Sequence, residues 1–109
     1  MPTKPTLSVI VTTYNWPDAL SLILRALNQQ SEKNFEVIVA DDGSNHETKH
    51  LLMLLRPQMC YSLTHVWQED DGFRAAEIRN KAAAKASGDY LVFIDGDCIP
   101  RFDFVAQHL

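Results

Sequence analysis

Short apolar runs alternate along this chain with longer segments whose apolar residues recur at helical spacing. Runs rich in β-branched and aromatic residues predict four strands, at residues 7–11, 35–40, 61–67 and 90–94. The last of these runs is wholly apolar and stands between two glycines. Such a run is typical of a strand that is buried on both faces of a parallel sheet.

The segments between the strands carry helix signals. Residues 46–56 follow a capping asparagine and end before a proline, and residues 74–87 are rich in alanine and precede Gly88, a residue suited to the left-handed position after a helix. Residues 102–109 begin a further helix. Residues 17–29 have proline in the first turn and a stripe of apolar residues at positions i, i+3, i+4 and i+7, namely Leu20, Ile23, Leu24 and Leu27.

This regular alternation of strands and helices indicates an α/β domain. We expect three layers: a mostly parallel sheet with right-handed crossovers, covered by helices on both faces. Every loop that follows a strand then lies at one edge of the sheet, where open α/β sheets bind their ligands. The loops expected there are residues 12–15, 41–44, 68–74 and 95–97. The sequence therefore predicts a ligand site built from polar segments that are far apart in the chain.

Length, charge and cysteine content narrow the classes of function. With 109 residues and a net charge of −4, the chain is one small domain without a basic excess for binding a nucleic-acid backbone. We see neither a signal peptide nor an apolar run long enough to span a membrane, and expect a soluble, cytoplasmic protein. Cys60 and Cys98 have no close spacing, which favours free thiols over a disulfide or a zinc site.

Two carboxylates separated by one glycine, Asp95 and Asp97, follow the last predicted strand. Hard oxygen ligands suit Mg²⁺ or Mn²⁺, which bridge the oxygens of a diphosphate. One carboxylate would take the ion and the other a sugar hydroxyl, while the glycine permits a tight turn. By itself the tripeptide also fits a solvated turn, so its interpretation as a metal site depends on the other loops.

Other polar residues at this edge have both a binding and a structural interpretation. Asp41 and Asp42 can accept hydrogen bonds from the N–H groups of a base, or they can cap a helix and form a turn with the following glycine. Arg74 and Arg79 are candidates for holding phosphates. For Arg79 and Asn80 the alternative is a solvated helix face, although asparagine is a poor helix former, which favours a functional role.

The sequence contains neither of two common nucleotide-binding loops. There is no Gly-x-x-x-x-Gly-Lys-Ser/Thr and no Gly-x-Gly-x-x-Gly after the first strand, which argues against a P-loop NTPase and an NAD enzyme. We interpret Trp16 and Trp67 as packing residues rather than ligand platforms. The four histidines show no metal-ligand spacing.

Four motifs in order along the chain resemble the inverting family 2 glycosyltransferases of GT-A fold. They are Ser-Val-Ile-Val-Thr-Thr-Tyr-Asn at 8–15, Phe-Glu-Val-Ile-Val-Ala-Asp-Asp-Gly-Ser at 35–44, Gln-Glu-Asp-Asp-Gly-Phe-Arg-Ala-Ala-Glu-Ile-Arg-Asn at 68–80 and Asp-Gly-Asp at 95–97. The third motif is similar to the branch of chondroitin-polymerase-type and lipopolysaccharide sugar transferases. The resemblance covers nearly the whole chain. It implies the strand order third, second, first, fourth and a nucleotide-sugar donor, most often a UDP-sugar.

By motif position, the resemblance assigns roles to individual residues. Thr12 and Tyr14 would line the nucleoside pocket. Asp42 would meet the uracil with Asp41 in support, and Asp95 would contact the ribose. The residues that would border the nucleotide are Gly72, Phe73, Arg74, Arg79 and Asn80.

The resemblance assigns the cofactor to Asp97, which would bind Mn²⁺ or Mg²⁺ and so neutralise the departing diphosphate. In the family, the acceptor site and the base that deprotonates the acceptor hydroxyl lie downstream of this motif. We therefore expect residues 1–109 to be the donor-binding half of a glycosyltransferase domain, inactive without its acceptor-binding half. The acceptor would be a glycan or glycolipid, and the full-length protein would be peripheral to the inner face of a membrane.

Truncation would leave residues 90–94 as an apolar sheet edge without a partner, which predicts a homo-oligomer.

Two other classes of protein compete with the glycosyltransferase interpretation. One is a stand-alone module that binds nucleotide-sugars without chemistry. The other is a phosphoacceptor receiver domain, which is disfavoured because its acidic pair should follow the first strand, whereas Asp41 and Asp42 follow the second.

Overall fold

The computed structural model describes residues 5–69, 75–95, 100–101 and 103–108. Its single sheet has four parallel strands in the order β3-β2-β1-β4. The strands are β1 (Leu7–Thr13), β2 (Phe35–Asp41), β3 (Ser62–Trp67) and β4 (Tyr90–Ile94).

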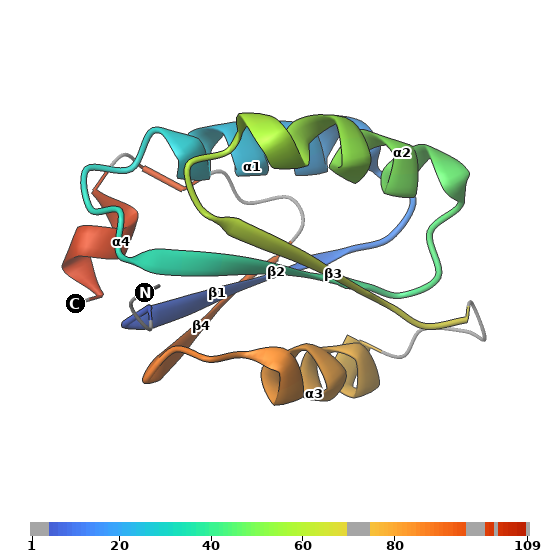
Figure 1. Cartoon of the computed structure of the whole chain (residues 1–109). Helices are drawn as coiled ribbons and strands as arrows, with labels where there is room; N and C mark the ends of the chain where they lie inside the picture. The colour runs from blue at the N-terminus through green and yellow to red at the C-terminus, as the bar shows by residue number, and fades with distance from the viewer. Residues whose placement is uncertain (1–4, 70–74, 96–99, 102, 109) are drawn as a thin grey trace.

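Helices cover both faces of this sheet (Figure 1). α1 (Pro17–Asn28) and α2 (His46–Leu55) lie on one face and α3 (Ala75–Lys85) on the other, and a short α4 (Phe104–Gln107) follows β4 in the chain. The predicted α/β class, the three layers and the strand order are confirmed. None of the helices described here is long and apolar enough to cross a membrane.

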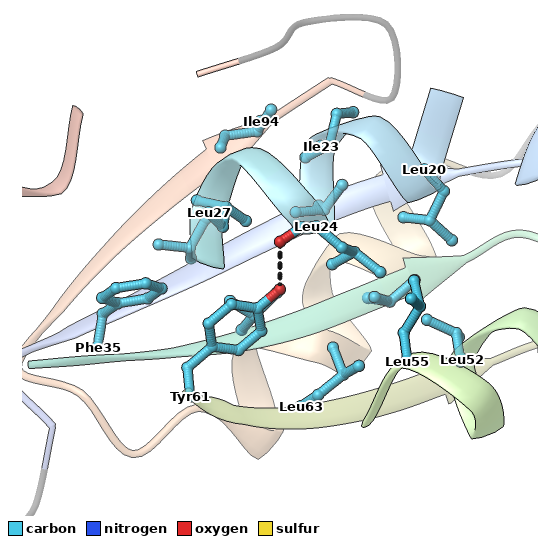
Figure 2. Packing of buried hydrophobic residues seen from close by; sticks show 14 of the residues in the cluster. Leu20, Ile23, Leu24, Leu27, Phe35, Leu52, Leu55, Tyr61, Leu63 and Ile94 are labelled. Carbon is cyan, nitrogen blue, oxygen red and sulfur yellow. Dashed lines mark hydrogen bonds between the residues drawn. The ribbon is translucent and has the colours of Figure 1, made fainter. Parts of the chain in front are cut away.

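The larger hydrophobic core lies between the sheet and helices α1 and α2 (Figure 2). The predicted stripe of α1 is buried here, because its four apolar residues are each at most 1% exposed. The Tyr61 hydroxyl donates a 2.7 Å hydrogen bond to the carbonyl oxygen of Leu24, and burial raises the pKa of this hydroxyl. A smaller cluster lies under α3 and comprises Ile10, Ile38, Ala40, Ile78 and Ala82.

The ends of α2 follow the sequence signals closely. Asn45 caps the helix, because its Oδ1 accepts a 3.1 Å hydrogen bond from the backbone N–H of Glu47. The helix ends at Leu55, and the chain continues as a 3₁₀ turn, η1 (Arg56–Gln58), which contains Pro57. The predicted end of this helix is therefore correct to within one residue.

The predicted role of Gly88 as the left-handed residue after α3 is wrong. The helix ends at Lys85, and the φ angle of Gly88 lies outside the left-handed region. A Cβ atom at this position would instead lie 2.6 Å from Ser8 Oγ and 2.7 Å from Ser8 N. Glycine is needed here because the segment that enters β4 runs directly against the backbone of β1.

The prediction that residues 90–94 are buried on both faces is also wrong for this chain. β4 lies at the edge of the sheet and pairs with β1. α3 packs mainly over β1, β2 and β3, so that it leaves much of β4 uncovered. As a result Leu91 is 41% exposed and Phe93 47%. Tyr90, which shares the opposite face with Val92 and Ile94, is 64% exposed, and only Ile94 is buried.

Candidate functional site

The carboxyl edge of the sheet brings together the residues that follow β1, β2, β3 and β4. Hydrogen bonds extend the strand pairing by one step: Asp42 N donates to Thr13 O at 3.1 Å, and Gln68 N donates to Asp41 O at 3.1 Å. On the other side of β1, Thr12 Oγ1 lies 3.5 Å from the carbonyl oxygen of Ile94. The convergence that the topology predicts is therefore observed for the described parts of these loops.

The loop after β1 is held against the loop after β2. Asn15 has a positive φ of 46°, a conformation that asparagine tolerates better than most residues. Its backbone N–H donates to Ser44 Oγ at 2.7 Å, and its Oδ1 accepts from Asn45 N at 2.8 Å. Tyr14, a predicted nucleoside contact that is 51% exposed, therefore precedes a residue that is fixed at two points.

The acidic pair after β2 is buried and hydrogen-bonded. Asp41 Oδ1 accepts from Ser44 N at 2.9 Å, and Asp41 Oδ2 lies 2.8 Å from His65 Nε2. Asp42 Oδ1 accepts from Gln68 Nε2 at 2.7 Å. Asp41 forms the turn that the glycine pattern predicts, whereas the predicted contact of Asp42 with a base stays a prediction.

α3 and β4 meet at the same edge through two predicted site residues. Arg79 Nη2 lies 3.2 Å from Asp95 Oδ1, and both side chains are substantially exposed, at 41% and 66%. An exposed ion pair contributes little to stability, typically below about 1 kcal/mol. Arg79 Nε is buried and has no hydrogen-bond partner among the described residues. The pair therefore places a cation and a carboxylate at the ligand edge, and Asn80 is exposed on the same helix.

Several predicted site residues lie outside the described residues: Gly72, Phe73, Arg74 and Asp97. Within the described part of the chain, no three His, Cys, Asp or Glu side chains gather as metal ligands would. Asp95 is an exposed carboxylate directly after β4, two positions before Asp97. Its oxygens have the chemistry that Mg²⁺ and Mn²⁺ prefer, so the residue types at this position fit the predicted metal.

The structure adds residues around the acidic loop that the sequence patterns did not single out. The indole N–H of Trp67 donates a 3.0 Å hydrogen bond to the carbonyl oxygen of Ser44. Trp16 and Trp67, which we interpreted as packing residues, are 55% and 52% exposed, so neither is part of the hydrophobic core. Asn15 and Ser44 belong to the quoted motifs and could have been found there, whereas nothing in the sequence marks His65 or Trp67.

An open pocket of about 490 Å³ lies between the start of α2 and the end of β3. Its walls include Lys49, His65 and Trp67, together with Ser44 and the first residues of α2. Of the predicted nucleotide-binding residues that the structure describes, none lines it. Its volume is therefore no evidence for the predicted nucleotide site.

A parallel sheet with its polar loops at the carboxyl edge defines an α/β protein that binds ligands at that edge. The chain matches the family model described as glycosyl transferase family 2 over residues 8–109. It therefore belongs to glycosyltransferase family 2. This confirms the family that the four motifs predict. It also supports the assignment of the chain to the nucleotide-sugar-binding domain of that family.

Among curated relatives, the chain is 38% identical over 96 residues to the hyaluronan synthase of Pasteurella multocida, covering 87% of this chain and 10% of that protein. It is 32% identical over 104 residues to the chondroitin synthase of Escherichia coli, covering 94% of this chain and 15% of that protein. The chain thus spans a minor part of the length of these relatives.

Two solved structures have the same fold. TarS 1–349 of S. aureus in complex with UDP superposes with a TM-score of 0.83 at 28% identity, covering 94% of this chain and 30% of that chain. The mannosyltransferase PcManGT of Pyrobaculum calidifontis, in complex with GDP-Man and Mn²⁺, gives a TM-score of 0.82 at 27% identity, covering 95% and 31%.

Proposed function

We propose that this chain binds the nucleotide-sugar donor, a UDP-sugar, for an inverting glycosyltransferase reaction. The observation that carries the proposal is the meeting of Arg79 and Asp95 at the edge that also presents Tyr14 and Asp42. A cation suits a charged diphosphate, a carboxylate suits the hydroxyls of a ribose, and an exposed aromatic ring suits a base. The complexes of TarS with UDP and of PcManGT with GDP-Man support this assignment by analogy.

In this proposal the base and ribose lie across the ends of β1, β2 and β4. Thr12 and Tyr14 line the nucleoside pocket, and Asp42 accepts a hydrogen bond from the uracil. Asp41 is fully buried and hydrogen-bonded through both oxygens, so its role is to support Asp42 rather than to contact the base. Asp95 accepts hydrogen bonds from the ribose hydroxyls.

The diphosphate would be bound on the α3 side of the site. Arg79 would bind a phosphate oxygen, and the residues that would border the nucleotide with it are Gly72, Phe73, Arg74 and Asn80. Asp97 would hold Mn²⁺ or Mg²⁺, and such an ion supplies Lewis-acid neutralisation of the leaving diphosphate. The acceptor in this proposal is a glycan or a glycolipid such as lipopolysaccharide, bound by parts of the enzyme other than residues 1–109, without which this chain does not turn over.

We include a location and an association state in the proposal. The thiol of Cys60 is exposed and forms no disulfide among the described residues, which is compatible with a reducing compartment, and we propose a cytoplasmic protein peripheral to the inner face of the membrane. The exposed apolar side chains of β4 support self-association of this chain.

The test is binding of UDP to the chain, measured by calorimetry with Mn²⁺ and again with a chelator. We expect saturable binding that weakens at least tenfold when the metal is removed. Asp97→Asn should abolish the effect of the metal, whereas Asp89→Asn, which changes a carboxylate at the opposite end of β4, should leave it intact. Absence of UDP binding would refute the donor site, and equal binding with the chelator would refute the metal role of Asp97.

A further inference from the structure

Ser44 links the loops at the carboxyl edge through three hydrogen bonds. Its N–H donates to Asp41 Oδ1 at 2.9 Å, its hydroxyl accepts from Asn15 N at 2.7 Å, and its carbonyl accepts from the indole N–H of Trp67 at 3.0 Å. Asp41 is the last residue of β2, Asn15 precedes α1, and Trp67 is the last residue of β3. The position of Ser44 therefore depends on a residue of β3 as well as on its own loop.

His65, also on β3, contacts the same loop through the side chain of Asp41. Its Nε2 lies 2.8 Å from Asp41 Oδ2, and the side chain of Asp41 is 1% exposed. A buried carboxylate needs hydrogen-bond donors, and Ser44 N and His65 Nε2 supply one to each oxygen. The roles in this pair depend on the His65 tautomer, and the tautomer with its proton on Nε2 donates to an ionised Asp41. Asp42, the proposed uracil contact, directly follows this fixed residue.

The exposure of Trp67 has no explanation in core packing. About half of its surface is exposed, yet its N–H is satisfied by Ser44. The register explains the contact, because Trp67 pairs with Asp41 and His65 pairs with Val39, which brings the end of β3 beside the acidic loop. Trp67 and His65 both belong to the edge strand β3 and lie outside the four motifs.

We propose that Trp67 and His65 are positioning residues for the donor-binding loop. They act through Ser44 and Asp41, and so fix the backbone from which Asp42 and Tyr14 are presented. This inference rests on the proposed function, since it assigns the geometry of the proposed nucleoside pocket to two residues of β3. Neither residue contacts the donor in this proposal.

The test uses Trp67→Phe, which retains an aromatic ring and removes the N–H donor. Tyr61→Phe is the matched control, because it also removes one hydrogen bond to a backbone carbonyl, in the core away from the ligand edge. Loss of a single hydrogen bond corresponds to about a three- to tenfold change in an equilibrium constant. We expect Trp67→Phe to weaken UDP binding by about that factor, and Tyr61→Phe to leave UDP affinity unchanged while lowering the melting temperature.

His65 provides a second, conservative pair of variants. His65→Gln retains an N–H within reach of Asp41 Oδ2 and should keep most of the UDP affinity. His65→Leu leaves the buried carboxylate without that donor, and should weaken UDP binding more than His65→Gln does.

Amide hydrogen exchange separates this proposal from the donor assignment, because it needs no ligand. In Trp67→Phe the amides of Asn15 and Ser44 should exchange faster than in the wild type, and in Tyr61→Phe they should not. If the wild type fails to bind UDP, the donor assignment fails while the exchange result still decides the positioning role. The proposal would be overturned if both amides in Trp67→Phe exchange at the wild-type rate. It would also be overturned if Trp67→Phe binds UDP as tightly as the wild type does.

Discussion

The hydroxyl of Ser8 donates a 2.6 Å hydrogen bond to Glu36 Oε2 and thereby joins the starts of β1 and β2 at the amino edge of the sheet. The same oxygen accepts from Ser87 N at 2.6 Å and from Ser87 Oγ at 2.9 Å. Burial by itself would raise the pKa of Glu36, but the hydrogen bonds from Ser8, Ser87 and Gly88 together lower it below the ordinary value of 4.5. This carboxylate ties the segment that enters β4 to the two central strands.

The lowered pKa of Glu36 predicts acid sensitivity. A carboxyl group with a depressed pKa contributes stability that is present above its ordinary pKa and is lost as the pH falls through the folded-state pKa. We expect Glu36→Gln to lower the free energy of unfolding at neutral pH by roughly 1–3 kcal/mol and to flatten its decline in acid. Urea denaturation at a series of pH values measures both effects. Glu77→Gln, an exposed change on α3, is the control, and equal acid slopes in the wild type and Glu36→Gln would contradict the prediction.

A methyl group at position 88 should be poorly tolerated. In Gly88→Ala the new Cβ would lie 2.7 Å from Ser8 N and 2.8 Å from the carbonyl carbon of Leu7, so the backbone has to move. We expect a loss of roughly 1–3 kcal/mol in the free energy of unfolding. Ala84→Ser adds an atom at an exposed position of α3 and should change it by less than about 0.5 kcal/mol. If thermal denaturation gives the two variants equal stability, the close approach of residue 88 to the backbone of Leu7 and Ser8 does not exclude a side chain there.

Removal of the Arg79 guanidinium should affect binding far more than stability. The ion pair with Asp95 is largely exposed, so Arg79→Met should change the free energy of unfolding by less than about 1 kcal/mol. A charged hydrogen bond to phosphate is worth more, and we expect UDP affinity to fall by about tenfold or more. Lys81→Met removes the same charge from an exposed position of α3 and serves as the control in calorimetry. Equal losses of affinity in the two variants would assign the effect to net charge alone.

The exposed edge of the sheet predicts self-association. β4 presents Tyr90, Leu91 and Phe93, and unprotected apolar edges favour pairing with another chain. We expect a two-fold dimer or a larger oligomer at micromolar concentration, measured by light scattering after size exclusion. Phe93→Lys should shift the population to monomer, whereas Leu22→Lys, at an exposed apolar position of α1, should not. A monomeric wild type would refute this prediction.

Local sequence signals determined the elements and the edge at which the site lies. The stripe of α1, the Asn45 cap and the apolar runs of β1 and β2 depend on residues that are close together in the chain, so their patterns are sufficient. The alternation of strands and helices predicts parallel strands, whose carboxyl ends share one edge, and this places Asp41 and Asp95 there. Family membership followed from the same motifs because they are contiguous stretches.

Only the tertiary structure decided how the site is supported. The contacts of His65 with Asp41 and of Trp67 with Ser44 depend on the register between β2 and β3, which the packing of the whole sheet sets. The close approach of Gly88 to Ser8 and the exposure of Phe93 depend on which segments pack over which strand. A residue pattern records whether a side chain is apolar, but the neighbours that cover it come from other parts of the chain.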